Sequence, residues 1–387
     1  MALFSPSESP AVVVKEIDLT GGVPNVQSTT GAIVGNFRWG PAEKRSLIAN
    51  ETELVEKFAA PDSDTTIDFH SASYFLRYSS ALQVVRAIDG NADNAISVSA
   101  DSGAGILSAV IVKNEDDFAS QSSALTAGNQ TFIGRYPGAL GNDLQVQMCH
   151  ANSTAYNAWG FKNEFDAVPA TSNFLTAKNG SNDEVHTVVV DKNGKFTGTK
   201  NAVLERYAFL SLAKDAKADD GTSIYVKDVI NERSEYIHMA GFDSAVVANI
   251  TKSGRVALDS GDNFLSTGAS LFNRHFTFNF SGGSNSNALT TTEFLSGFDL
   301  FEDKDQVEID FLIAPGMTTT SDQTTVVNDL IATAQNTRKD CVVVASPARD
   351  DVVNLTNAGT IVTNVVATAD TFTKSSYLFV DNNYLKV

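Results

Sequence analysis

The sequence TTTEFLSGFDLFEDKDQVEIDFLIAPG (residues 290–316), followed after a polar segment by RKDCVVVASPARDD (338–351), gives the predicted fold class. It contains two short β-branched runs, Val307–Ile313 and Cys341–Ala345, and a segment with helical spacing precedes each run. Such alternation is typical of a parallel sheet whose strands are buried on both faces by helices. The stretch therefore predicts an α/β domain.

The first 94 residues show the same alternation of strands and helices. Asn50 with Glu53 is typical of a helix N-cap, and Pro61 ends the helix that follows. The predicted elements are strands at Gly31–Phe37 and Leu82–Ile88 and helices at Glu51–Phe58 and Thr66–Tyr78.

Residues 95–284 follow a different pattern, with more serine, threonine, asparagine and glycine and with short alternating strands. In the last of them, Phe276, Phe278 and Phe280 point one way, which is typical of a half-buried sheet. One helix is expected, at Glu205–Lys217. The predicted strands are Leu144–Met148, Val185–Val190, Ile224–Val229 and His275–Phe280.

These patterns predict an α/β plus β protein with several domains. A discontinuous α/β core domain would comprise residues 1–94 and 285–387, beginning with an extended arm at 1–29. A small lobe at 95–134 and a β-rich domain at 135–284 would be inserted between its halves. The length of 387 residues suits such a division, because single cores rarely grow this large.

Charge and cysteine content exclude several classes of protein. The chain has 28 Lys plus Arg against 46 Asp plus Glu, a formal charge of −18, so it would repel phosphate backbones and anionic membranes. Only two cysteines occur, Cys149 and Cys341, which excludes a disulfide framework. Neither a basic, apolar signal peptide nor a run of ~18 apolar residues is present. We expect no direct nucleic-acid partner and no membrane insertion.

A search for catalytic chemistry finds no convincing constellation. The sequence lacks a Walker loop and a Gly-x-Ser-x-Gly elbow, and its five histidines lack ligand spacing. Cys149 and His150 are adjacent on a predicted strand, so their side chains should point to opposite faces. Asp350 and Asp351 follow a strand, where a metal could bind, but they fit better as carboxylates in a first helical turn. We expect no catalytic, cofactor-binding or metal-binding residues.

The run Ala11–Ile17 is β-prone and has no partner strand nearby in the sequence. It is either an edge strand of its own sheet or an arm that pairs with another chain. Its apolar residues are Val12, Val13, Val14 and Ile17.

Read in order, several fragments resemble the contractile tail sheath protein of T-even-type myophages. Each fragment is only moderately specific, and their colinear order over nearly the whole chain carries the resemblance. The fragments are MALFSP (1–6), TTGAIVGNFRWGPA (29–42), LQVVRAID (82–89), RYPGALGNDLQVQM (135–148), LFEDKDQVEIDFLIAPG (300–316), RKDCVVVASPARDDVV (338–353) and SSYLFVDNNY (375–384).

The resemblance implies a structural virion protein, not an enzyme. Such subunits polymerise helically around the tail tube and contract to drive the tube through the host envelope for genome delivery. The implied partners are copies of itself, the tube and the baseplate. The subunits would assemble in the host cytoplasm and end in the phage tail, and Val12, Val13, Val14 and Ile17 would belong to a strand donated to a neighbour.

Two departures from the family pattern stand out. The segment between Ile88 and Tyr136 is much shorter than the protruding lobe of the T-even protein. The chain also stops where the family continues into a C-terminal, tube-contacting domain, so contacts with the tube and the baseplate are expected in a region beyond residue 387.

Three alternatives remain open. The chain could belong to the sheath of a pyocin-like contractile injection particle, which works by the same mechanism. It could be an α/β enzyme with a site near Asp350 and Asp351. It could also be a receptor-binding or carbohydrate-binding virion protein that uses Trp159 and Phe161 as a platform, although both fit a core better.

Overall fold

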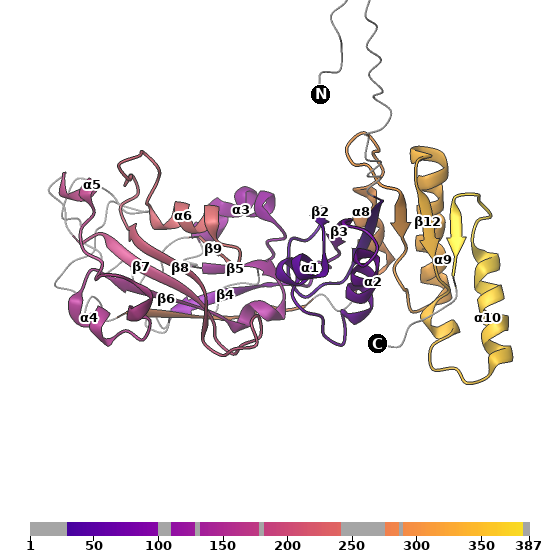
Figure 1. Ribbon diagram of the computed structural model, residues 1–387, viewed down its shortest axis with the longest axis horizontal. Helices are drawn as coiled ribbons and strands as arrows, with labels where there is room; N and C mark the ends of the chain where they lie inside the picture. Colours follow the sequence, from indigo (N-terminus) through magenta and orange to yellow (C-terminus); the bar gives the residue numbers. More distant parts are fainter. Residues whose placement is uncertain are drawn as a thin grey trace, which may run out of the picture.

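The computed structural model describes residues 29–99, 110–127, 132–177, 182–240, 275–285 and 289–381. These residues form two lobes that lie side by side, each organised around one β-sheet (Figure 1). The chain passes from the first lobe to the second after residue 86 and returns after residue 281. Helices and two sheets together give a mixed α/β and β architecture, as the sequence predicts.

A six-stranded sheet organises the first lobe, with strand order β13-β12-β11-β1-β3-β2. All neighbours pair in parallel except β2, which is antiparallel to β3. The sheet combines strands from both ends of the sequence, because β1 lies directly between β3 and β11. Its strands are β1 (Thr30–Gly35), β2 (Ser46–Ile48), β3 (Ala81–Arg86), β11 (Phe311–Ile313), β12 (Val342–Ala345) and β13 (Leu378–Val380).

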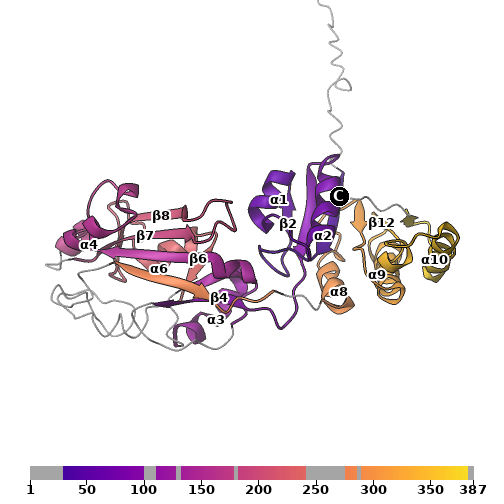
Figure 2. The ribbon, with the colours of Figure 1, turned by 90° about the horizontal axis from the view of Figure 1, so that it is seen from below.

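Helices lie on both sides of this sheet (Figure 2). On one side, α1 (Glu51–Phe58) and α2 (Thr66–Leu76) form a core with the buried side chains of β1 and β3. On the other side, α8 (Thr291–Asp299) and α9 (Thr320–Ala332) form a second core with β1, β11 and β12. A last helix, α10 (Ala358–Thr371), lies beyond α9 at the end of the molecule.

Local sequence signals explain where these helices begin. The Asn50 side chain accepts a hydrogen bond from the Glu53 amide at 3.0 Å, and the Glu53 carboxylate accepts one from the Ala49 amide at 2.8 Å. This reciprocal cap starts α1 where the sequence predicts it. In α8, Gly297 allows close packing on β1, since a Cβ there would lie 2.5 Å from a methyl carbon of Val34.

A seven-stranded antiparallel sheet organises the second lobe, with order β8-β7-β6-β10-β4-β5-β9. Phe276, Phe278 and Phe280 are all buried on one face of β10, which confirms the predicted alternation. The strands are β4 (Asn94–Ser99), β5 (Phe132–Pro137), β6 (Leu144–His150), β7 (Glu184–Asp191), β8 (Ala202–Ser211), β9 (Ile237–Met239) and β10 (Phe276–Ser281).

The segment expected as a small lobe at 95–134 contributes two strands to this sheet. β4 lies between β10 and β5, and α3 (Glu115–Ala127) packs beside them through Phe118. The shorter helices of the second lobe are α4 (Ser153–Ala158), α5 (Asn173–Thr176) and α6 (Val226–Arg233).

Two predicted elements are wrong in type, and the predicted strand Val307–Ile313 is wrong in extent. Ile224–Val229 is not a strand, because most of it forms the start of α6, which buries Val226, Val229 and Ile230 at helical spacing. Glu205–Lys217 is not a helix, because its first half pairs with β7 as part of β8. Tertiary pairing overrides helix propensity there.

The predicted strand Val307–Ile313 shortens to its last residues. The Val307 carbonyl accepts a hydrogen bond from the buried Arg338 guanidinium at 2.9 Å instead of joining the sheet. Both cysteines are free and buried. Within the described part of the chain, no helix is long and apolar enough to span a bilayer.

Candidate functional site

The arm residues Val12, Val13, Val14 and Ile17 lie outside the described residues. The described candidates are therefore the strand ends of the six-stranded sheet, the aromatic residues of the second lobe and the junction between the lobes.

Asp350 and Asp351 follow β12 in a short 3-10 turn, Arg349–Asp351. The Asp350 side chain is exposed, and its backbone amide donates to the Thr318 carbonyl at 3.2 Å. Asp351 is buried and accepts hydrogen bonds from the hydroxyls of Thr320 and Thr368. Its carboxylate thus ties α9 to α10. No group of three or more potential metal-ligating side chains occurs among the described residues.

A crevice is expected where the chain leaves β1 toward β3 and leaves β11 toward β12, since α/β sheets often bind ligands at such a switch point. Here Asp68 of α2 lies at the end of β1 and accepts a hydrogen bond from the Asn36 amide at 2.7 Å. A Cβ on Gly35 would lie 2.7 Å from the Asp68 Cβ, so helix and strand end are in close contact. This contact joins α2 directly to the end of β1.

Burial raises the pKa of Asp68 to about 6, although the Asn36 amide and the charge of Arg349 both act to lower it. The side chain is partly exposed to solvent. A carboxyl group with this pKa changes its charge in mildly acidic solution. The free energy of unfolding therefore depends on pH through Asp68.

His150 and the aromatic pair of the alternative interpretation, Trp159 and Phe161, lie in the packed interior of the second lobe. The Cys149 thiol donates to the His150 carbonyl, and burial lowers the pKa of His150 to about 3. Trp159 is fully buried and donates its indole N–H to Gln147 at 2.8 Å. Phe161 packs against the same buried cluster. An exposed binding platform at Trp159 is therefore contradicted.

The junction between the lobes is organised by Arg86, which is 2% exposed. Its guanidinium donates to the carbonyl oxygens of Gly40 at 3.0 Å, Arg38 at 3.5 Å and Pro137 at 2.8 Å. Pro137 belongs to the second lobe and the other two to the first. Gly138 beside it has a φ of +141° and little free space, so glycine is required there. Burial lowers the pKa of Arg86 to about 9, which leaves it charged at neutral pH.

Trp39, in the loop after β1, packs into the core of the second lobe. Its ring meets Tyr136 edge-on at 5.5 Å and Phe196 at 5.3 Å between centroids. Large aromatic side chains contribute much of the apolar area buried at a contact. The core of the second lobe therefore includes an aromatic side chain from the first lobe.

Polar contacts reinforce this junction from the loop after Trp39. The Ala42 amide donates to the Lys113 carbonyl at 2.9 Å. Lys113 pairs with Glu43 at 2.7 Å, and Lys44 pairs with Asp116 at 3.1 Å. These ion pairs are partly exposed, so each contributes little to the free energy of unfolding. Arg86 and Trp39 therefore make the main contacts between the two lobes.

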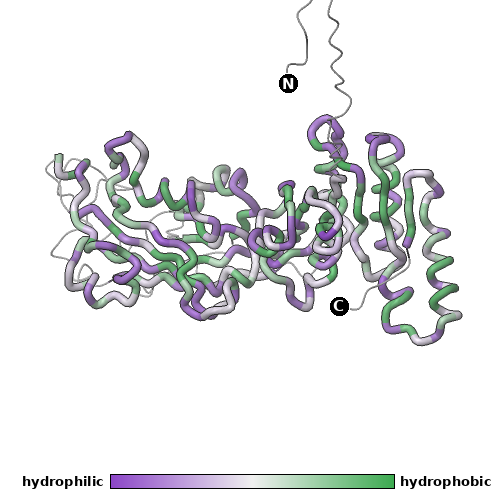
Figure 3. Tube along the Cα trace, in the orientation of Figure 1, coloured by the Kyte–Doolittle hydropathy of each residue, from purple (hydrophilic) through white to green (hydrophobic). Residues whose placement is uncertain are grey.

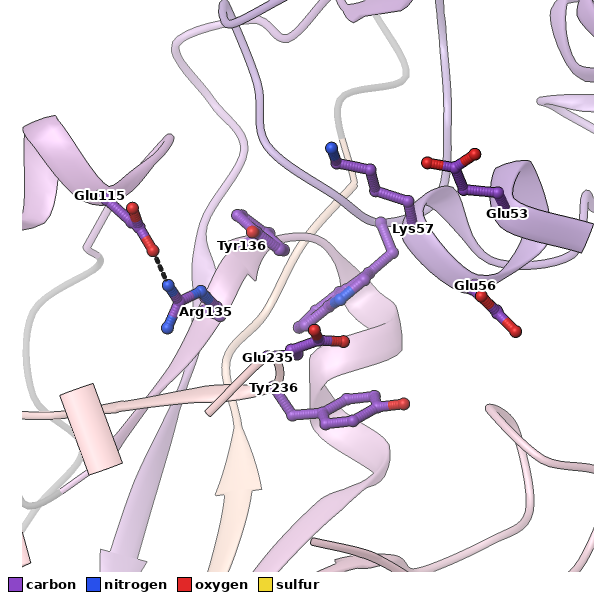
Figure 4. Close-up of a pocket in the computed structure, with 9 residues that line it drawn as sticks. Glu53, Glu56, Lys57, Glu115, Arg135, Tyr136, Glu235 and Tyr236 are labelled. Atoms are coloured by element: carbon purple, nitrogen blue, oxygen red, sulfur yellow. Dashed lines mark hydrogen bonds and ion pairs between the residues drawn. The ribbon is translucent and has the colours of Figure 1, made fainter. Parts of the chain in front are cut away.

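A cavity of about 350 Å³ lies at the same junction (Figure 4). An ion pair between Arg135 and Glu115 lies at one side of it, and the remaining acidic groups are spread around the rim. This arrangement offers no nucleophile–base pair. The lining residues are Trp39, Glu53, Glu56, Lys57, Glu115, Arg135, Tyr136, Glu235 and Tyr236.

Arg86 and Trp39, the residues that join the two lobes, were not predicted from the sequence. Both lie in fragments that carry the family resemblance, but neither belongs to a catalytic or ligand-binding motif. A lone arginine in the apolar run LQVVRAID was the available sign, because a charged residue inside a buried strand needs partners.

Comparisons with known proteins give one consistent result. The chain is 35% identical over 204 residues to the tail sheath protein of Salmonella phage ViI, covering 52% of this chain and 29% of that protein. It is 25% identical over 450 aligned residues to the tail sheath protein of Enterobacteria phage T4, covering 97% and 66%. No family model matches.

A solved sheath tail protein from Listeria innocua gives a TM-score of 0.43 at 11% identity, covering 89% of this chain and 56% of that one. The sequence relatives confirm the resemblance to tail sheath proteins that the ordered fragments indicate. The chain spans at most 66% of the length of these curated relatives.

Replacing Arg86 with methionine should destabilise the protein by about 3 kcal/mol, because buried carbonyl oxygens lose their donor. Urea denaturation followed by tryptophan fluorescence measures the change. Arg206→Met is the matched control, since that side chain is 66% exposed and lies 3.8 Å from Glu164. An Arg86→Met protein as stable as the control would contradict the anchoring role.

Replacing Asp68 with asparagine should remove a pH dependence of stability between about pH 4 and 6. The pKa of Asp68 is raised in the folded state, so the wild type gains stability as the pH falls through this window and loses it as the pH rises through about 6. Asparagine keeps an oxygen for the Asn36 amide. Melting temperatures of both proteins across this range provide the measurement, and parallel curves would refute the assignment.

Proposed function

We propose that this protein is the structural subunit of a contractile phage tail sheath. Subunits would polymerise helically around the tail tube and contract to drive it through the host envelope. The alignment with the T4 tail sheath protein, which covers 97% of this chain, carries the proposal. The relatives are named for a structural role, which supports a non-enzymatic function for this chain.

The two-lobed architecture fits a mechanical role. Arg86 and Trp39 join the lobes through buried contacts, so the described part of the chain can move as one body while its connections to neighbours change. Assembly of this kind depends on heterologous contacts between copies and not on a pocket. The polar ends of the strands are occupied by structural hydrogen bonds, as at Asp351 and Asp68.

The proposed domain division assigns residues 1–94 and 285–387 to the core and 135–284 to the insert, with 95–134 beside it. The six-stranded sheet supports the discontinuous core, because β1 and β11 are neighbours in it. Contacts with the tube and baseplate are proposed for a region outside this chain. The arm residues Val12, Val13, Val14 and Ile17 are proposed to pair with a neighbouring copy in the virion tail.

Electron microscopy of the full-length protein tests this function. Purified alone at high concentration and viewed in negative stain, it should form hollow tubes, because helical self-association is the property proposed. A protein that stays monomeric at every concentration reached would contradict the proposal. The same sample assayed by dynamic light scattering controls for amorphous aggregation.

A further inference from the structure

The cavity at the junction is lined by both lobes. Its volume of about 350 Å³ lies within the range of sites that bind small molecules. Helix α1 of the first lobe faces it from one side, and α3, β5 and the segment before β9 face it from the other (Figure 4). A ligand here would therefore contact residues of both lobes at once. The first lobe supplies Trp39, Glu53, Glu56 and Lys57, and the second supplies Glu115, Arg135, Tyr136, Glu235 and Tyr236.

Carboxylates outnumber cations in this lining. Four glutamates face Lys57 and Arg135, and Arg135 is already paired with Glu115. Glu53 is held in place, because its carboxylate accepts the hydrogen bond from the Ala49 amide. In α1, the hydrophilic residues alternate with the apolar residues that enter the core (Figure 3). Glutamates of the two lobes thus repel one another across the cavity, and a bound cation would offset this repulsion.

The two tyrosine hydroxyls at the cavity experience the same negative charge. Burial raises the pKa of Tyr136, and the carboxylates of Glu115 and Glu235 add to the rise while Arg135 opposes it. Burial also raises the pKa of Tyr236, and Glu235 is among the carboxylates that add to it. Glu235 therefore acts on both phenols, which indicates that negative charge is concentrated between them.

Aromatic rings form one wall of the cavity. Tyr136 meets Trp39 edge-on, Trp39 meets Phe196, and Phe196 meets Tyr236 at 5.4 Å between centroids, so the four rings form a continuous row. Trp39 is 3% exposed, and no described residue accepts a hydrogen bond from its indole N–H. Aromatic rings attract organic cations through their negative faces. The indole N–H also leaves a donor for an oxygen atom of a ligand.

The lining distinguishes between a metal ion and a larger cation. Within the described part of the chain, no three acidic, histidine or cysteine side chains lie close enough together to hold one metal ion. The glutamates are spread around the cavity, and tyrosine and tryptophan rings lie between them. An organic cation can span such a distance and also contact the rings, so it fits this site better than a metal ion does.

We propose that the cavity binds a small organic ammonium ion that carries an oxygen atom near its charge, such as an amino alcohol. The charged group lies between the carboxylates of Glu56 and Glu235, and the oxygen accepts a hydrogen bond from the indole N–H of Trp39. A lysine side chain of another protein offers the same chemistry, an ammonium group with a backbone carbonyl oxygen nearby.

Such a ligand also stabilises the junction between the lobes. Its carboxylate contacts come from α1 in the first lobe and from the segment before β9 in the second. The site is complete only while the two lobes keep their positions, so binding favours the folded, joined arrangement. Ligand binding at this cavity is separate from the self-association that the sheath function requires.

Titration with choline tests the site in the 387-residue protein. Tryptophan fluorescence should change to saturation, and the change is assigned to Trp39 because the only other tryptophan, Trp159, is fully buried in the second lobe. The melting temperature should rise with choline concentration. The neutral isostere 3,3-dimethylbutan-1-ol keeps the hydroxyl group and lacks the charge, so it should produce neither effect. An equal response to both compounds would overturn the proposal.

A second titration distinguishes the two sources of the ammonium group. Nα-acetyl-lysine amide carries the ammonium group and the carbonyl oxygens of a lysine residue in a protein. Tighter binding of choline supports a free small molecule as the ligand, and tighter binding of the lysine derivative supports a protein side chain. If neither compound gives a saturable change, the proposal is wrong.

Matched variants locate the binding to this cavity. The double variant Glu56→Gln with Glu235→Gln should weaken choline binding about tenfold, because two carboxylates lose their charge. Both side chains are exposed, so the variant should fold normally, which circular dichroism checks. The control is Glu51→Gln with Glu232→Gln, which removes the same charge from exposed positions that do not line the cavity. Equal affinities of the two double variants would overturn the proposal.

Discussion

The buried guanidinium of Arg86 is the interaction on which the arrangement of this protein depends. It satisfies carbonyl oxygens from the loop after β1 and from the end of β5, and it lies where the chain passes between lobes. Trp39 adds an apolar anchor a few residues away. Because a buried charge is stable only while its partners stay in place, rotating one lobe against the other would break several contacts together.

The six-stranded sheet has the largely parallel, helix-covered arrangement that many α/β enzymes share. The strand ends, where α/β enzymes place their chemistry, hold groups that fix helices. Asp68 fastens α2 to the end of β1, and Asp351 fastens α10 to α9. The same sheet geometry that positions catalytic groups elsewhere would here maintain the shape of a subunit.

The sequence predicts elements well where local chemistry and burial agree. The β-branched runs at β1 and β12 and the Asn50–Glu53 cap of α1 are such cases. Prediction fails where partners outside the segment itself decide its structure. β8 becomes a strand through pairing with β7, and Val307 leaves the sheet to bind Arg338. The partners of Arg86 lie up to 51 residues away, so the local sequence can indicate a buried arginine that needs partners but cannot identify them.

The most direct test of the account is the distance distribution between one spin label on each lobe. Labels at Asn157→Cys and Glu302→Cys are suitable, because both residues are exposed and the native cysteines are buried. Double electron–electron resonance should give a single narrow distribution if the lobes form one rigid body. A broad or two-peaked distribution in the wild-type protein would contradict the account.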